Sequence, residues 1–397
     1  MRKRILIGAL MAWLAPASLF AQDAPELSAQ APPATPMPRP QPMPRPGTPA
    51  TPSGPTTPAT PTPGTSRVLA GPTPPNFDLA STGTRGRSIE LPNMYGDFQE
   101  VASLARGTAS NTGILLNESN RVGAGRLPVP VIRGAYKISE NEAPRPVDRV
   151  YLTYHYFYDV NPGQRQRFDL PITNVHRQTF GIEKTNLDGN ASIGLRLPLL
   201  QLTGPTELDR ATVGDLSIIL KYAFINEPLE FDADGSLLGG RVLSGGLVVT
   251  APTGGAAAFT VQNPVVHPTL LQPYIGGTTT FRRAYGQFIS SIAVPTDDRD
   301  TTYLFNSVQV GYLLMNDLSG SRFVRSVTPI AELHVNVPFN NRDINRFPVG
   351  ATDIVSFTVG TSFGLGSRSS LNLGVNAPVT GPRVYALETL VHLNVRY

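Results

Sequence analysis

The chain of 397 residues contains no cysteine. Without thiols it has no disulfide framework, no thiolate metal site and no cysteine nucleophile. The Gly-x-Ser-x-Gly, His-Glu-x-x-His and P-loop motifs are also absent, and the five histidines are scattered. No base is visibly paired with a nucleophile, so we expect no enzyme, no catalytic residue and no cofactor. A Ser or Asp acting with His in an outer-membrane hydrolase is the alternative.

A large charge of one sign is missing as well. The formal net charge is +4, and three of the positive charges lie on Arg2, Lys3 and Arg4, which leaves +1 for the rest of the chain. This balance gives no reason to expect nucleic acid as a partner.

Long apolar runs are absent after the first residues of the chain. Residues 1–21 predict a secretory signal, with a basic start, an apolar stretch over residues 5–14 and a small-residue cleavage site that ends at Ala21. The stretch is too short to span about 30 Å of hydrocarbon as an anchor. No cysteine follows it, which excludes a lipoprotein. If the chain lies in a membrane, it must do so as a barrel.

Residues 22–75 predict a disordered linker rich in Pro and Thr. Met37-Pro-Arg-Pro40 recurs as Met43-Pro-Arg-Pro46, and Thr-Pro units follow. This composition favours an extended polyproline spacer. Binding of a periplasmic partner to the linker is the alternative. Residues 76–148 form either a plug in the barrel or a periplasmic extension, with a short helix expected over residues 98–105.

Residues 149–397 predict an all-β, antiparallel transmembrane β-barrel. In the last strand the odd positions from Tyr385 to Tyr397 are mostly apolar, and the even positions include Glu388, His392 and Asn394. Such alternation places one face in lipid and the other in a lumen. A soluble sandwich would show the same alternation. The terminal aromatic and the secretion signal favour the barrel, and we expect the barrel-assembly machinery to bind this strand.

Turn residues divide this region into about twelve strands, an even number. We expect them over residues 149–160, 167–185, 191–202, 215–225, 244–252, 271–282, 284–294, 302–315, 326–337, 353–364, 369–378 and 385–397. Connections are expected to alternate between short turns and long loops. Residues 226–243 are the exception, because they form a long connection on the side of the barrel where short turns are expected. Either the expected strands omit a pair there, or that side of the barrel carries an excursion.

Several segments also resemble a known family. Two early segments are Gly214-Asp-Leu-Ser-Ile-Ile-Leu-Lys-Tyr222 and Gly246-Leu-Val-Val-Thr-Ala-Pro-Thr-Gly254. The later segments are residues 353–360, residues 371–382 and the final strand, and all of them occur in the order found in the family. Together they resemble the barrels of the MetA-pathway of phenol degradation family. The resemblance covers about residues 149–397. It implies a transporter-like outer-membrane barrel for small, aromatic or other, molecules, and it assigns no binding residue.

The strand faces predict which side chains line the lumen and contact a solute. His334-Val-Asn336 and His392-Leu-Asn394 are near copies, each with a Glu on the same face. Two ligands on a strand without a third partner do not make a metal site, and we expect none. Charges of both signs are present, so strong ion selectivity is not expected. The candidate lumen residues are Arg196, Asp215, Lys221, Glu332, His334, Asn336, Glu388, His392, Asn394 and Arg396.

The sequence therefore predicts a barrel in the cell outer membrane, in contact with outer-membrane lipid, that lets small solutes pass through its lumen. The rival hypothesis is a non-conducting barrel that serves as an envelope anchor or interaction protein.

Overall fold

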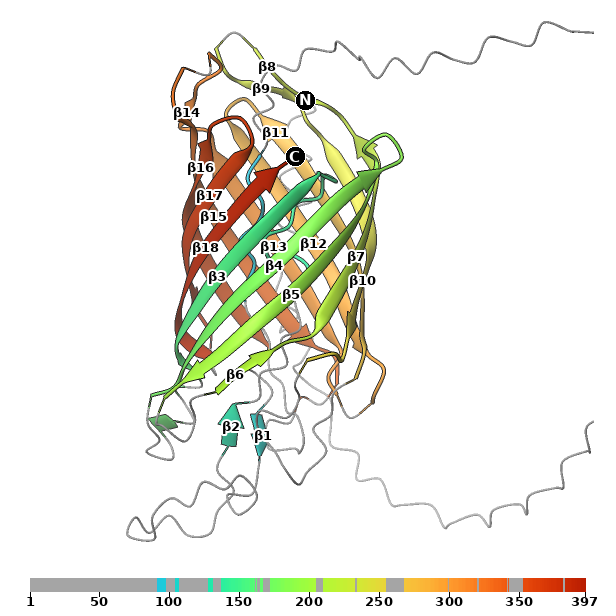
Figure 1. The fold of residues 1–397 in the computed structure, drawn as a ribbon, viewed down its shortest axis with the longest axis vertical. Helices are drawn as coiled ribbons and strands as arrows, with labels where there is room; N and C mark the ends of the chain where they lie inside the picture. Colours follow the sequence, from blue (N-terminus) through green and yellow to red (C-terminus); the bar gives the residue numbers. More distant parts are fainter. Residues whose placement is uncertain are drawn as a thin grey trace, which may run out of the picture. The chain divides into compact units, whose positions relative to one another are not determined.

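A closed antiparallel barrel forms the body of the computed structural model (Figure 1). The structure describes residues 91–97, 137–160, 172–204, 210–232, 234–254, 268–298, 300–319, 321–340, 353–380 and 383–397, the backbone of two short strands, and a few single positions. The expected signal and linker, residues 1–75, lie outside this part. No helix in the described residues is long and apolar enough to cross a membrane.

The main sheet has fourteen strands, of which the short β6 (Arg210–Val213) and β14 (Met315–Asn316) lie beside the barrel strands. The remaining twelve close on themselves through the pairs β18–β3 and β13–β15. In order round the barrel they are β3 (Arg149–Val160), β4 (Asn174–Asn186), β5 (Ala191–Thr203), β7 (Leu216–Asn226), β10 (Val242–Ala251), β11 (Leu270–Phe281), β12 (Ala284–Pro295), β13 (Tyr303–Tyr312), β15 (Val324–Pro338), β16 (Ile354–Leu365), β17 (Ser369–Pro378) and β18 (Tyr385–Arg396).

The predicted strands are confirmed, with shifted ends. The strand expected from residue 167 begins at Asn174. The helix expected over residues 98–105 is wrong where it is described, because β1 (Leu104–Arg106) pairs as a strand with β2 (Pro128–Pro130).

The exception at residues 226–243 is an excursion from the barrel. β8 (Leu229–Phe231) and β9 (Leu237–Gly239) form a separate two-stranded sheet there, so the barrel keeps its twelve strands. The excursion lies at the end where β3 begins and β18 ends, which we call the termini end (Figure 1). Short turns at residues 187–190, 282–283 and 366–368 share this end, as expected for a periplasmic side.

Apolar side chains cover the outside of the barrel. On β5, Ile193 is 50% exposed and Leu195 42%, and on β16 Val359 is 49% exposed. The side chains at alternate positions, such as Arg196 on β5 and Thr358 on β16, are buried inside the barrel. A water-soluble sheet would place its apolar face in the core, so the sandwich alternative is wrong. A closed barrel with an apolar outside and a polar inside suits a lipid bilayer, and the chain is an outer-membrane β-barrel.

Tyr385 departs from the expected pattern. It was grouped with the outward face of the last strand, but it is 1% exposed. Its hydroxyl donates to Asn376 Oδ1 at 2.6 Å, and its ring meets that of Phe157 edge to face, with centroids 5.4 Å apart. A phenol that finds a buried acceptor is better placed inside than in lipid.

Candidate functional site: the filled barrel interior

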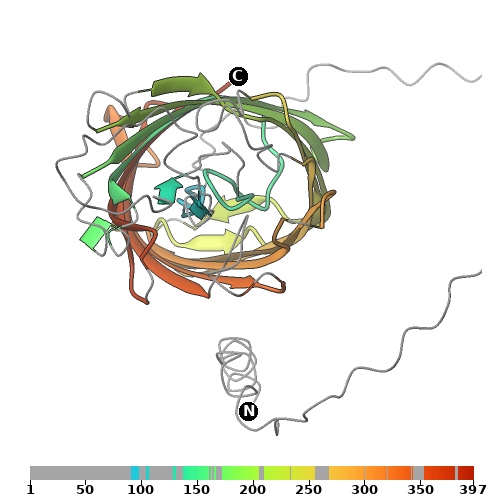
Figure 2. The same ribbon diagram turned by 90° about the horizontal axis from the view of Figure 1, so that it is seen from below.

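The interior of the barrel is occupied by the chain itself. Residues 91–97 and residues 137–148, which we call the two inner segments, lie within the ring of strands in both views (Figures 1 and 2). Met94 and Tyr95 are completely buried, and Glu140 and Glu142 are each 2% exposed. The inner face of the barrel therefore contacts protein rather than open water along this part of its length.

The two inner segments are joined to each other. Met94 N donates to Glu142 O at 2.8 Å. Gly96 has a φ of +75°, and a Cβ at this position would lie 2.6 Å from the Glu140 Cα, so only glycine fits here. The Lys137 ammonium also donates to the Asp97 carboxylate. These contacts make the segments one unit inside the barrel.

Glu142 of the second inner segment is held by three cations of the wall. Its Oε1 accepts from Lys221 Nζ at 2.5 Å and from Arg149 Nη2 at 2.9 Å. Its Oε2 accepts from Arg196 Nη2 at 2.6 Å. The wall carboxylate of Glu183 accepts from Lys221 at 2.9 Å and from Arg149 Nε at 2.8 Å. The three cations come from β3, β5 and β7, so one carboxylate ties the segment to three strands.

Glu140 is held by a fourth cation. Arg177 Nη2, on β4, donates to Glu140 Oε2 at 2.5 Å. His155 Nε2 lies 3.4 Å from Glu140 Oε1, and its Nδ1 lies 2.7 Å from Glu388 Oε1. The His392 ring stacks on His155, with 3.0 Å between their Nε2 atoms. This part of the interior is a continuous polar network.

The opposite wall binds the first inner segment. Glu332, on β15, accepts from Tyr95 N at 2.5 Å and from Gly96 N at 3.0 Å. The Tyr95 hydroxyl donates to Leu373 O at 2.9 Å. A Cβ at Gly374 would lie 2.9 Å from the Tyr95 ring, and one at its cross-strand partner Gly360 would lie 2.5 Å from the Tyr95 hydroxyl. The two glycines form a seat for this ring on β16 and β17.

Asp97 lies at the deep end of the first inner segment. Its Oδ2 accepts from Asn336 Nδ2 at 2.7 Å and from Ser356 Oγ at 2.8 Å, while Lys137 donates to its Oδ1. The Lys137 ammonium also donates to Asn336 Oδ1 at 2.8 Å. His334 Nδ1 lies 3.7 Å from Asp97 Oδ1. The contact is a buried ion pair surrounded by amide and hydroxyl groups.

Side chains of both inner segments make apolar contacts with the wall. Tyr95 packs with Ile330 and Leu390, and Leu91 packs against a cluster that includes Tyr285. Met94 and Ile138 are 0% and 1% exposed. They pack with wall residues from β7, β10, β11 and β12, namely Ile219, Val248, Tyr274 and Ile289. The segments are therefore anchored by apolar packing on one side and by charges and hydrogen bonds on the others.

The surroundings of the inner segments shift the pKa of their acids. Burial raises the pKa of Glu142, but Lys221, Arg149 and Arg196 outweigh it and lower the value from 4.5 to about 2. Burial also raises the pKa of Asp97, and Lys137 and His334 bring it below its ordinary value. For Glu140, burial outweighs Arg177 and Arg196, so its pKa is raised. Glu142 thus favours docking as a carboxylate.

The candidate lumen residues have different surroundings in the structure. Arg196, Lys221, Glu332, His334, Asn336, Glu388, His392 and Asn394 are buried in contacts inside the barrel. Asp215 is 2% exposed, but it precedes β7 and accepts from Gly254 N at 2.8 Å, so it braces a loop. Arg396 lines a pocket at the termini end. Their contact with a solute stays a prediction.

Several functional side chains of this site were not predicted. Arg149 and Arg177 belong to the inner face of the barrel. Arg177 lies an even number of residues before Glu183 on β4, so the alternation of faces would have identified Arg177 as an inward-facing residue. Asp97, Glu140 and Glu142 lie outside the strands, where no periodicity marks them.

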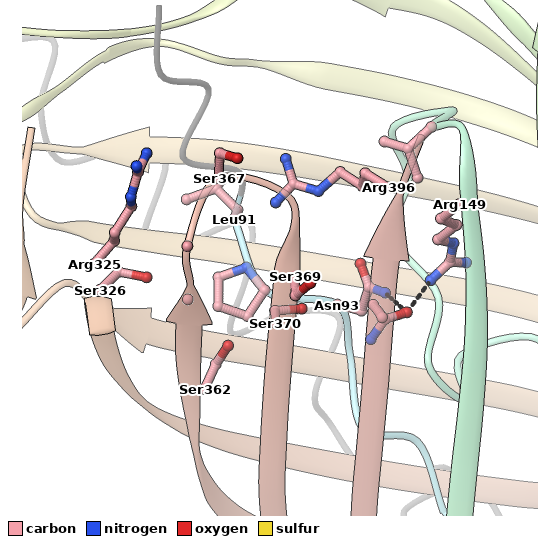
Figure 3. Close-up of a pocket in the computed structure, with 15 residues that line it drawn as sticks. Leu91, Asn93, Arg149, Arg325, Ser326, Ser362, Ser367, Ser369, Ser370 and Arg396 are labelled. Atoms are coloured by element: carbon pink, nitrogen blue, oxygen red, sulfur yellow. Dashed lines mark hydrogen bonds between the residues drawn. The ribbon is translucent and has the colours of Figure 1, made fainter. Parts of the chain in front are cut away.

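A small polar pocket lies at the termini end, between the first inner segment and the wall (Figure 3). Its volume of about 40 Å³ admits water but no organic solute. Three arginines and several serines line it, namely Arg149, Arg325, Arg396, Ser326, Ser362, Ser367, Ser369 and Ser370.

An apolar cluster lies inside the opposite end of the barrel. It comprises Phe157, Val160, Val175, Leu200, Leu202, Ile354, Val384 and Tyr385. These side chains are at most 5% exposed, so the interior beyond the polar network is packed as well. Among the described residues, no group of three or more His, Asp or Glu could hold a metal ion.

Comparison with known proteins adds the following. No family model and no curated protein matches the chain. It is similar to the COG4313 outer membrane channel from Pseudomonas putida F1 (10% identity, 67% of this chain, 98% of that chain, TM-score 0.40). It is also similar to the KdgM porin (10% identity, 62% of this chain, 99% of that chain, TM-score 0.35). Outer membrane phospholipase A from Escherichia coli is similar as well (13% identity, 64% of this chain, 91% of that chain, TM-score 0.33). Likeness at this level carries no argument about function, and the resemblance to the MetA-pathway family stays a prediction.

Proposed function

We propose that the barrel is a gated pore for small solutes and that the two inner segments are its plug. The observation that carries this proposal is the ion-pair network between Glu142 and the cations of three wall strands. A lumen lined with charged side chains is what an aqueous path requires, and the same side chains hold the plug while the path is closed.

The chemistry of the contact supports a plug that can leave. Buried ion pairs give little net stability, because the attraction only offsets the loss of hydration. Water that enters the lumen would hydrate Arg149, Arg196, Lys221 and Glu142 again. The apolar contacts of the inner segments with the wall are divided among small clusters: Met94 and Ile138 join one, Tyr95 a second, and Leu91 packs against a third. Displacement of the plug therefore costs less free energy than opening an apolar core of the same size.

A covalent lock tests the proposal in the full chain, which has no native cysteine. Ser139 of the plug and Ser307 of β13 are both buried, and their Oγ atoms lie 3.1 Å apart. Cysteines at both positions bring two sulfur atoms within reach of a disulfide. We expect oxidised Ser139→Cys/Ser307→Cys protein to be silent in planar bilayers, and we expect the reduced protein to conduct like the wild type.

The matched control is a lock within the wall. Ser217 and Thr250 are cross-strand partners on β7 and β10, with their hydroxyls 2.8 Å apart. The Ser217→Cys/Thr250→Cys protein should conduct equally when oxidised and reduced. Conductance that persists through the plug lock would refute gating. Silence of the wild type and of every reduced form, in protein whose heat-modifiable migration shows a folded barrel, would refute the pore and leave the envelope anchor.

A further inference from the structure

Four cations of the inner wall lie on neighbouring strands. Arg149, Arg177, Arg196 and Lys221 come from β3, β4, β5 and β7, which are neighbours in the sheet, and each is at most 4% exposed. Among the wall carboxylates, Glu183 lies between these cations on β4, Glu388 lies on β18 beside β3, and Glu332 lies farther round the barrel on β15. The order of the charges along the sequence, which predicted weak selectivity, does not show that the cations lie on neighbouring strands. We call the four cations the basic wall.

The plug neutralises the basic wall with two carboxylates. Glu142 contacts Arg149, Arg196 and Lys221 at 2.5 to 2.9 Å, and Glu140 contacts Arg177 at 2.5 Å. Glu183 is a carboxylate of the wall itself that contacts these cations. Departure of the plug would leave four cations facing Glu183 in a water-filled lumen, where their summed positive potential attracts anions.

The positive surface continues toward the periplasmic mouth. Arg149 of the basic wall also lines the pocket at the termini end, together with Arg325 and Arg396 (Figure 3). Serine hydroxyls from β15, β16 and β17 surround the same space. Guanidinium and hydroxyl groups are the donors that bind carboxylates, with arginine able to donate two parallel hydrogen bonds. The pocket and the basic wall, which share Arg149, thus both suit an anion.

We infer that the basic wall is the solute site of the pore and that its solutes are small organic anions with one or more carboxylates, for which Glu140 and Glu142 of the plug stand in. The inference rests on the proposed function, since it assigns a solute class to the same lumen. An arriving carboxylate competes with Glu142 for Lys221, Arg149 and Arg196, so the solute itself favours the open state by mass action.

The test neutralises the plug carboxylates in the full chain. We expect Glu140→Gln/Glu142→Gln protein in planar bilayers to conduct more than the wild type and, by reversal potential in a KCl gradient, to prefer chloride over potassium by about tenfold. Succinate should reduce its chloride current by occupying the basic wall. Glu227→Gln is the matched control, because Glu227 pairs with Arg241 on the exposed surface and its loss should change neither property.

A second change locates the effect. Adding Arg196→Gln to the double variant leaves three of the four cations and should lower both the chloride preference and the block by succinate. Because Arg196 is buried, Arg325→Gln at the mouth serves as a second probe. Arg325 takes part in no ion pair with another described residue, and its loss should weaken the succinate block. A conducting double variant without anion preference or succinate block would overturn the inference and leave the pore intact. Silence of the folded double variant and of the reduced plug-lock protein would instead overturn the pore.

Discussion

The ring of Tyr95 lies where a side chain at Gly374 would have to be, 2.9 Å from the position of a Cβ at that glycine. Tyr95 belongs to the plug and Gly374 to β17, so a missing side chain in the wall creates the seat for an aromatic side chain of the plug. The ring is also tilted against His392, with centroids 5.6 Å apart. The shape of the wall therefore fits the first inner segment, in addition to the hydrogen bonds that hold it.

Filling the seat should release the plug. In Gly374→Ala protein the added methyl group would overlap the Tyr95 ring, and overpacking of this kind costs about 1–3 kcal/mol. The Val359 O lies 3.3 Å from the same position, a tight contact, so the backbone of the neighbouring strand has to shift by a few tenths of an ångström. We expect a higher open probability in single-channel recordings and faster proteolysis of residues 91–97, with unchanged heat-modifiable migration of the barrel.

Gly194→Ala is the matched control for this change. Gly194 also faces the interior, on β5, but a Cβ there would meet its nearest neighbour, Ile219, at an ordinary 3.4 Å. This variant should behave as the wild type. Equal effects of the two substitutions would show that any alanine in the wall opens the pore and that the Tyr95 seat has no special role.

The ion pair of Lys137 and Asp97 should hold the deep end of the plug. Lys137→Met leaves a buried carboxylate without its ammonium partner, a loss that typically costs about 3–5 kcal/mol. We expect this variant to open frequently. Lys137→Met/Asp97→Asn removes the stranded charge and should recover most of the closed state, because Asn336 and Ser356 still offer hydrogen bonds. If the double variant is as open as Lys137→Met alone, the two residues are not coupled.

Acid should open the pore through Glu142. Its pKa is about 2 when the plug is docked and 4.5 ordinarily, so its contribution to docking is complete above pH 4.5 and is lost as the pH falls toward 2. The groups that face it are Arg149 on β3, Glu183 on β4, Arg196 on β5 and Lys221 on β7.

Conductance recorded from pH 7 down to pH 3 measures this dependence. Glu140 acts in the opposite direction, because its raised pKa favours docking in the protonated form. The difference in conductance between the wild type and Glu142→Gln at each pH isolates the effect of Glu142. The variant should already be open at pH 7, and its conductance should rise little below pH 4.5. A Glu142→Gln protein that is closed at pH 7 and opens in acid like the wild type would assign the titration to other groups.

The strands of this barrel were predictable because lipid and lumen impose opposite demands on alternate residues. On β17, Leu373 and Val375 are 41% and 40% exposed, whereas Asn372 and Asn376 are completely buried. This contrast appears in the sequence as apolar and polar residues that alternate with a period of two. The excursion at β8 and β9 was recognised only as an inconsistency in loop length, since its strands of three residues are too short to show a period.

The sequence offered a plug over residues 76–148 only as one of two alternatives, and the contacts of the inner segments could not be predicted. Residues 91–97 and 137–148 have no regular secondary structure apart from turns, and their partners lie up to 301 residues away, as for Asn93 and Asn394. Their acids find the basic wall through tertiary contacts alone. Arg177 is different, because its position an even number of residues from Glu183 on β4 places it on the inner face, so the local pattern was sufficient to predict it. The position of a charge around a barrel depends on strand order, which local patterns do not contain.

The apolar outside makes a prediction about depth in the membrane. Leu197 lies at the middle of β5 on its outward face, 38% exposed. An arginine at the bilayer midplane costs about 2–4 kcal/mol, and one near the interface only about 0–1 kcal/mol. Leu197→Arg should therefore lower the free energy of unfolding in lipid vesicles, measured by reversible denaturant titration. Gln201→Arg, on the same face near the end of β5, is the control and should change it little. If both variants unfold at the wild-type denaturant concentration, the outward face of β5 does not meet hydrocarbon, and the apolar outside would need another partner.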